Sequence, residues 1–181
     1  MPTQMVKSTR MVEAHVWTCA FYVFVSALAA APFIFVWHYW HEAATKGWSW
    51  SSVDSRVMYV DGAKTLITGS GIAVALLASS VFSQRATASS LVTFSAKVAV
   101  VCLISCVCLS LVVILALLRG HERAKARNIE NLRAAGKLTG QQVDEGQLNK
   151  GELLFILVPG GCALSCFLVG FVFLGRIVFH F

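Results

Sequence analysis

The sequence predicts an all-α integral membrane protein: four transmembrane helices, with a short extramembrane helical hairpin between the third and the fourth. Charged residues make up 13% of the 181 residues and apolar residues 57%, whereas soluble domains carry about 25% charged residues. Residues 98–118 contain no charge, amide, glycine or proline, and about 20 such residues let a helix cross a bilayer core about 30 Å thick. Three further runs without a formal charge, at about 15–40, 65–84 and 153–175, complete a single membrane domain over residues 1–181.

Aromatic side chains mark both ends of the first expected span, 15–40. Trp17 lies near one end and Trp40 near the other, and indole rings favour the headgroup level of a bilayer. Pro32 lies inside this span and is expected to kink it, which neighbouring helices allow when they satisfy the freed carbonyl. The polar residues 41–64 that follow are expected to connect the first two spans along the membrane surface.

Small residues recur every four positions in the remaining spans. In the second span, Gly71, Ala75 and Ser79 share one helix face, and such a stripe lets another helix approach closely. The third and fourth spans carry similar stripes, with Cys102, Cys106 and Ser110 in one and Cys162, Cys166 and Gly170 in the other. We predict that these residues pack helices together. Facing pairs of cysteines could instead bind a soft metal ion, but packing is favoured because a thiol also serves as a small apolar side chain.

The segment 119–152 is the only sizeable hydrophilic part of the chain. A helix over 121–135 is expected to continue out of the membrane and to end at Gly136. Thr139 and Gln142 have the spacing of a capping box, which predicts a second short helix. The resulting hairpin fits either a solvated surface or a docking surface for a neighbouring subunit, because so small a hairpin buries too little to be stable alone.

The distribution of basic residues predicts the orientation in the membrane. With four spans, the two termini and the link 85–97 lie on one side, and the two longer connections lie on the other. Ten of the 15 lysines and arginines lie in those longer connections. The positive-inside rule therefore places both connections in the cytoplasm or matrix, and both termini across the membrane.

A candidate metal site lies at the end of the first span, where His38, His41 and Glu42 occur together. Two imidazoles three residues apart can face the same way, but zinc or copper needs three or four ligands of defined geometry. A belt of histidine and tryptophan at headgroup level is the favoured alternative. The expected spans contain no carboxylate, and no catalytic constellation or cofactor motif can be picked out. We therefore predict no cofactor.

We expect a structural or accessory subunit of a larger multi-subunit membrane complex, with a respiratory or other energy-transducing complex as the leading example. Its expected partners are other membrane subunits and lipids. Nucleic acid is not expected, because no basic groove with interleaved aromatics occurs. We expect no catalytic activity of its own. The mildly basic N-terminal arm and the lack of loop cysteines favour the mitochondrial inner membrane, with a bacterial plasma membrane as the alternative.

Two other functions stay open at this point. A small oligomeric channel or transporter would line its pore with the hydroxyls of Ser70, Ser79, Ser80 and Ser83, although the expected spans lack the buried charges typical of ion pathways. A membrane metal-binding enzyme would instead be centred on His38, His41 and Glu42.

Overall fold

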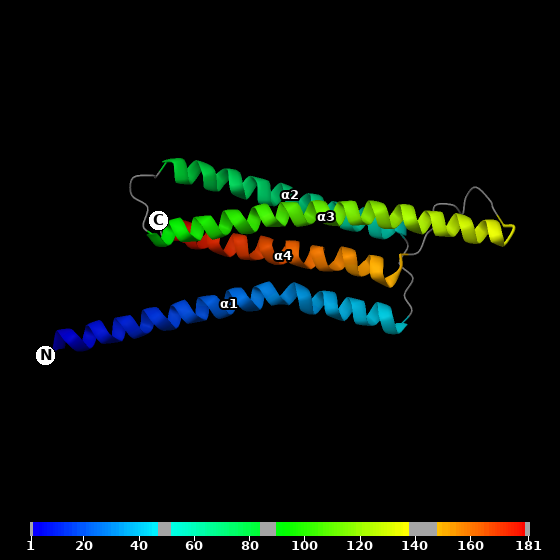
Figure 1. Cartoon of the computed structure of the whole chain (residues 1–181). Helices are drawn as coiled ribbons and strands as arrows, with labels where there is room; N and C mark the ends of the chain where they lie inside the picture. Colours follow the sequence, from blue (N-terminus) through cyan, green and yellow to red (C-terminus); the bar gives the residue numbers. More distant parts are fainter. Residues whose placement is uncertain (1, 47–51, 84–89, 138–147, 180–181) are drawn as a thin grey trace.

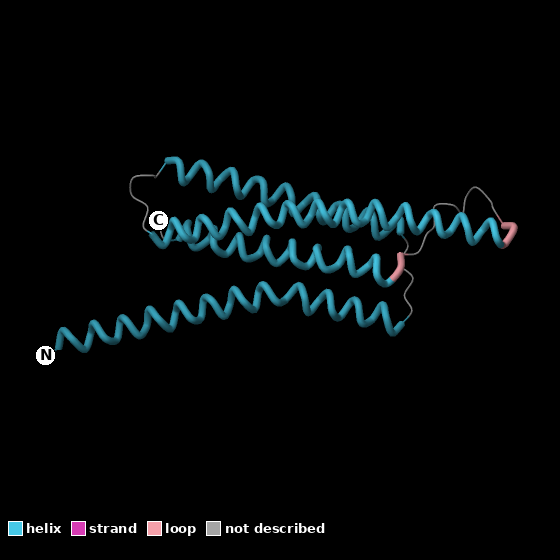
Figure 2. Tube along the Cα trace, viewed as in Figure 1, coloured by secondary structure: helices cyan, strands magenta, loops and turns pink. Residues whose placement is uncertain are grey.

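The computed structural model describes residues 2–46, 52–83, 90–137 and 148–179. Within these residues the chain forms four helices and no strand (Figures 1 and 2): α1 (Pro2–Lys46), α2 (Ser52–Ser83), α3 (Ser90–Ala134) and α4 (Lys150–Phe179). Each helix contains a stretch long and apolar enough to cross a membrane. The predicted all-α membrane fold with four spanning helices is confirmed.

The four helices run up and down, and both termini lie at the same end of the bundle (Figure 1). Helix α4 contacts all three other helices, and α3 packs against both α2 and α4. Helix α1 touches only α4, so α1 and α2 make no contact with each other among the described residues. Helix α1 therefore lies against α4 alone, whereas α2, α3 and α4 all contact one another.

Helix α1 is held to α4 by a few specific contacts. The Ser165 hydroxyl donates a 2.8 Å hydrogen bond to the Ala29 carbonyl. At the end of the bundle that holds the termini, the rings of Phe21 and Phe173 meet edge to face at 5.6 Å, and the Arg176 guanidinium lies 4.5 Å from the centre of the Phe21 ring. Helix α1 bends in its middle (Figure 1), where Pro32 removes a backbone donor and disturbs the helical ladder.

Helix α1 runs to Lys46 and α2 begins at Ser52, so the connection expected over 41–64 is shorter than predicted, and residues 47–51 of it lie outside the described residues. The most apolar part of α2 is Val57–Ser79. Tyr59 and Val60 pack against a buried cluster on α3 and α4, and Ala63 is buried. Because apolar residues recur here at the spacing of one helix face, the apolar part of α2 begins at Val57, more than two turns before the expected start at Thr65.

This earlier start also corrects the expectation that no carboxylate lies within a span. Asp61 lies inside the apolar part of α2, where it forms an ion pair with Lys64 at 3.8 Å. The side chains of both residues are about two-thirds exposed, at 69% and 67%. The pair is therefore formed on the outer surface of the bundle.

Helix α3 is much longer than the bilayer is thick. Its 45 residues extend about 68 Å at 1.5 Å per residue, more than twice a bilayer core of about 30 Å, and its C-terminal part continues beyond the ends of the other helices (Figure 1). Gly136 adopts a positive φ of 63°. The Lys137 and Gly136 amides donate to the Leu132 and Arg133 carbonyls at 3.0 and 3.2 Å, which is the Schellman pattern.

The predicted end of this helix at Gly136 is thus confirmed, whereas a helical hairpin is not shown. The predicted second short helix, with Thr139 and Gln142, falls on residues 138–147, which lie outside the described residues. The described part of the connection is dominated by the long extension of α3 itself.

Candidate functional site

The closest helix contact lies at the seam between α3 and α4. A Cβ atom added at Gly170 would lie 2.9 Å from Leu103 Cγ and 3.5 Å from the Ala99 carbonyl oxygen. Because any side chain at this position would collide with α3, the glycine sets how closely the two backbones approach. Cys106 and Ser110 are also fully buried, so these three members of the predicted packing stripes lie in the bundle interior.

Four thiols gather along the same seam. Cys102 and Cys106 belong to α3 and Cys162 and Cys166 to α4, the two helices of the seam, and all four are free. No group of three or more His, Cys, Asp or Glu side chains in the described part of the chain is arranged to hold a metal ion. The geometry favours the packing interpretation, in which cysteine acts as a small apolar side chain.

The histidines of the candidate metal site lie on the outside of the bundle. His38 and His41 are both exposed on α1, while Glu42 belongs to α1 but its side chain lies outside the described residues. Next to these histidines in the sequence, the rings of Trp37 and Trp40 lie 6.0 Å apart. This mixture of indole and imidazole at the end of an apolar helix is typical of the headgroup level, and metal binding here stays a prediction.

The serines expected to line a pore do not form one line on α2. Ser70 is buried in the bundle, whereas Ser79 is exposed and donates a 2.8 Å hydrogen bond to the Leu76 carbonyl. Nine residues of α-helix turn through about 900°, which places the two hydroxyls on opposite faces. Ser80 and Ser83 lie in α2, but their side chains are outside the described residues.

The predicted small-residue stripe of α2 lies on its outer face. Gly71, Ala75 and Ser79 are all exposed, and a Cβ atom added at Gly71 would meet nothing within 4 Å. The buried residues of α2, such as Ala73 and Leu77, lie on the opposite side of the helix. Among the described residues, the stripe therefore packs against no other helix of this chain.

The ion pair of α2 lies on this same outer face. At 100° per residue, Asp61 and Lys64 fall within about 40° of the centre of the stripe. We call the surface formed by Asp61, Lys64, Gly71, Ala75 and Ser79 the outer face of α2. It combines charged and small side chains, which is an unusual surface to present to lipid tails.

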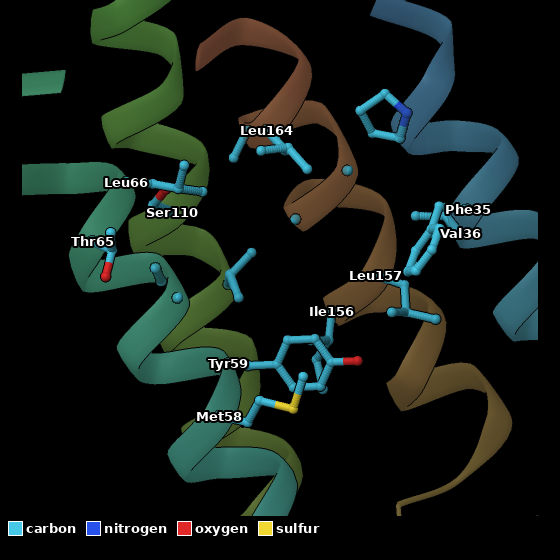
Figure 3. A pocket seen from close by; sticks show the side chains of 17 residues that line it. Phe35, Val36, Met58, Tyr59, Thr65, Leu66, Ser110, Ile156, Leu157 and Leu164 are labelled. Carbon is cyan, nitrogen blue, oxygen red and sulfur yellow. The ribbon is translucent and has the colours of Figure 1, made fainter. Parts of the chain in front are cut away.

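A cavity of about 790 Å³ lies where α1 and α2 fail to meet (Figure 3). Phe35 and Val36 of α1 face Met58, Tyr59 and Leu66 of α2 across it (Figure 3). Its floor is formed mainly by α4, including two residues without side chains, Gly160 and Gly161. The walls are almost entirely apolar.

Sequence reasoning missed this cavity. The available signal was the occurrence of glycines at positions 62 and 160 within apolar stretches, since a missing side chain leaves volume unfilled. That signal cannot reveal the cavity alone, because it does not show that α2 and α4 bring these glycines to one place.

An ion pair beyond the uncharged runs 98–118 and 153–175 joins α3 to the start of α4. Arg127 donates two hydrogen bonds to the Glu152 carboxylate, at 2.9 and 2.7 Å. The Asn149 amide, at the N-cap of α4, donates a third at 2.9 Å, in the manner of a capping box. These bonds outweigh desolvation and lower the pKa of Glu152, and the bond to Glu152 raises the pKa of Arg127.

No protein-family model, curated protein or solved structure matches this chain. Among the described residues, two surfaces of the bundle lack a helix partner and bear on the function. These are the outer face of α2 and the walls of the cavity between α1 and α2.

Proposed function

We propose that this protein is a structural or accessory subunit of a larger multi-subunit membrane complex, and that the outer face of α2 contacts a helix of a neighbouring subunit. The observation that carries the proposal is the position of Gly71, Ala75 and Ser79, which form a small-residue stripe directed away from the bundle. Lipid tails are as apolar as leucine, so membrane helices associate through close packing, and small side chains permit that packing.

The ion pair of α2 supports the same assignment. Asp61 and Lys64 lie in the apolar part of α2, and both side chains are exposed in the single chain. Charged residues within membrane segments almost always face other protein or water rather than lipid. A neighbouring subunit that covers the stripe would also shield this pair from the bilayer.

The setting of the complex is part of the proposal. A respiratory or other energy-transducing complex of the mitochondrial inner membrane is the leading example, with a bacterial plasma membrane as the alternative. Its support is the sequence: Lys7 and Arg10 in the N-terminal arm, and cysteines confined to the apolar runs.

Extraction in a mild detergent, followed by a native gel and mass spectrometry of the bands, tests the proposal. We expect the chain in a heteromeric band, and we expect Gly71→Phe to release it because the ring would hold the partner helix away. The matched control is Gly175→Phe on α4, where an added Cβ also meets nothing within 4 Å, and it should leave the band intact. A stable monomer in the wild type, or a band unaffected by Gly71→Phe, would contradict the proposal.

A further inference from the structure

The cavity between α1 and α2 is positioned to bind a component of the surrounding bilayer. Four helices contribute to its walls, but α1 and α2 make no contact with each other among the described residues. The cavity is therefore accessible sideways, between these two helices, to the lipid that surrounds the bundle. Its volume of about 790 Å³ lies within the range of roughly 300–1,000 Å³ that is typical of small-molecule sites.

The cavity occupies one half of the bilayer. On α4 its lining runs from Ile156 to Leu164, which is about 12 Å of helix, close to half of a hydrocarbon core about 30 Å thick. The lining residues of α1, Pro32 to Val36, lie near the end of its apolar part, and those of α2, Met58 to Leu66, lie near the start. All of them belong to the side of the two long connections.

The length of the cavity distinguishes between possible occupants. Its lining on α4, from Ile156 to Leu164, covers about two helical turns, whereas a helix that crosses the membrane has about six. The cavity is therefore too short for a transmembrane helix of another subunit. A flexible hydrocarbon chain that enters from one leaflet matches its depth, its apolar walls and its sideways opening.

The charge next to the cavity selects the kind of lipid. Residues 119–152, which connect the uncharged runs of α3 and α4, carry seven basic side chains and five acidic ones, a net charge of +2, and Arg119 directly follows the uncharged run 98–118. A juxtamembrane excess of this kind attracts anionic headgroups, by about 1 kcal/mol per basic residue near the surface.

We propose that the cavity binds an acyl chain of an anionic phospholipid from the leaflet on the side of the long connections. The phosphate of this lipid lies in the basic zone at the membrane surface, and its chain passes between α1 and α2 to rest on Gly160. The bound chain then fills the space that the two helices leave between them. This site is independent of the outer face of α2, which lies on another side of that helix.

The test is native mass spectrometry of the full chain, purified from vesicles of phosphatidylcholine alone or mixed with phosphatidylglycerol. We expect the wild type to retain phosphatidylglycerol in preference to phosphatidylcholine. Gly62→Phe should weaken that retention about tenfold, the equivalent of about 1.4 kcal/mol. Gly62 lines the cavity, and an added Cβ there meets nothing within 4 Å, so the backbone leaves room for a side chain to begin at this position.

Gly160→Leu serves as a second variant that fills the cavity from its floor, where a Cβ would lie 3.9 Å from Val113 Cγ2, an ordinary contact distance. Gly175→Phe is the matched control and should retain lipid like the wild type. Equal retention of the two lipids, or unchanged retention in both cavity variants, would overturn the proposal. Neither cavity variant should affect the heteromeric band, so failure of this inference and failure of the subunit assignment can be told apart.

Discussion

Glycine has opposite roles at the seam between α3 and α4 and at the gap between α1 and α2. At the seam, Gly170 is required because a Cβ atom would lie 2.9 Å from Leu103 Cγ. At the gap, Gly62 has nothing within 4 Å of the same position, and the missing side chain leaves open space. A glycine in a membrane helix therefore indicates either close contact or a cavity, and only the opposing helix decides which.

The largest expected effect on stability comes from shortening a buried side chain at the seam. Leu103 is 0% exposed, and Leu103→Ala should lower the free energy of unfolding by about 2–4 kcal/mol, because van der Waals contacts are lost and a void remains. Phe35→Ala, at a cavity wall where the side chain is 65% exposed, should cost less than about 1 kcal/mol. Unfolding titrations in detergent micelles measure both values, and similar losses would show that seam and gap do not differ as described.

A methyl group added at the two types of glycine sharpens the comparison. Gly170→Ala should destabilise the protein by about 1–3 kcal/mol, because Leu103 must shift away, whereas Gly71→Ala on the outer face should be neutral or slightly stabilising through helix propensity. The double variant Gly170→Ala with Leu103→Ala should lose less than the sum of the two single variants. Strict additivity in the same unfolding titrations would refute the contact.

The ion pair beyond the membrane tests the end of the same seam. Arg127→Ala should cost about 1 kcal/mol, at the lower end of the range for charge-assisted hydrogen bonds, because Arg127 is 38% exposed and water screens the pair. Lys64→Ala, which removes the looser and more exposed pair with Asp61, should cost about 0–0.5 kcal/mol in the isolated chain. Melting temperatures of the purified variants give the ranking, and the reverse order would contradict it.

The same pair should make stability depend on pH. The pKa of Glu152 is lowered in the folded protein from its ordinary value of 4.5, so the unfolded chain takes up a proton first as the pH falls. The stabilisation is fully present above the ordinary value and is lost as the pH drops through the lowered one. Wild type and Arg127→Ala should therefore differ in melting temperature at pH 7 and converge in acid; a constant difference down to low pH would argue against the pair.

The smallest effect concerns a hydroxyl inside the bundle. The Ser70 hydroxyl is fully buried and has no hydrogen-bond partner. Ser70→Ala should leave stability unchanged or raise it by up to about 1 kcal/mol, because the cost of an unsatisfied buried group is removed. A clear loss of melting temperature would show that this hydroxyl has a partner in the membrane.

The number of membrane helices could be predicted from the sequence because lipid demands about 20 consecutive apolar residues, and residues 98–118 meet that demand without exception. The end of α3 could be predicted because Gly136 accepts a positive φ at low cost. Both features depend on neighbouring residues along the chain, which the sequence shows directly.

The start of α2 and the cavity could not be predicted in the same way. Asp61 and Lys64 interrupt the hydropathy of residues 57–64, and only the packing of Tyr59 and Val60 against α3 and α4 shows that this part is helical and buried on one side. The cavity depends on α1 and α2 staying apart, which is a property of the whole bundle. The outer face of α2 lies between these cases: its composition could be read from the sequence, whereas its direction could not.

The length of α3 has a mechanical consequence. This helix is a single rod from Ser90 to Ala134, without an internal proline, and about 24 Å of it lies beyond residue 118, where its uncharged run ends. Its one glycine, Gly120, is buried, and an added Cβ there would lie 3.1 Å from Leu148 Cδ2, so we expect a sideways force on the tip to tilt the buried portion as well. We expect that clamping the tip changes spin-label distances across the seam between α3 and α4. A force applied to the protruding segment of α3 would then change the tilt of the helices that pack against it.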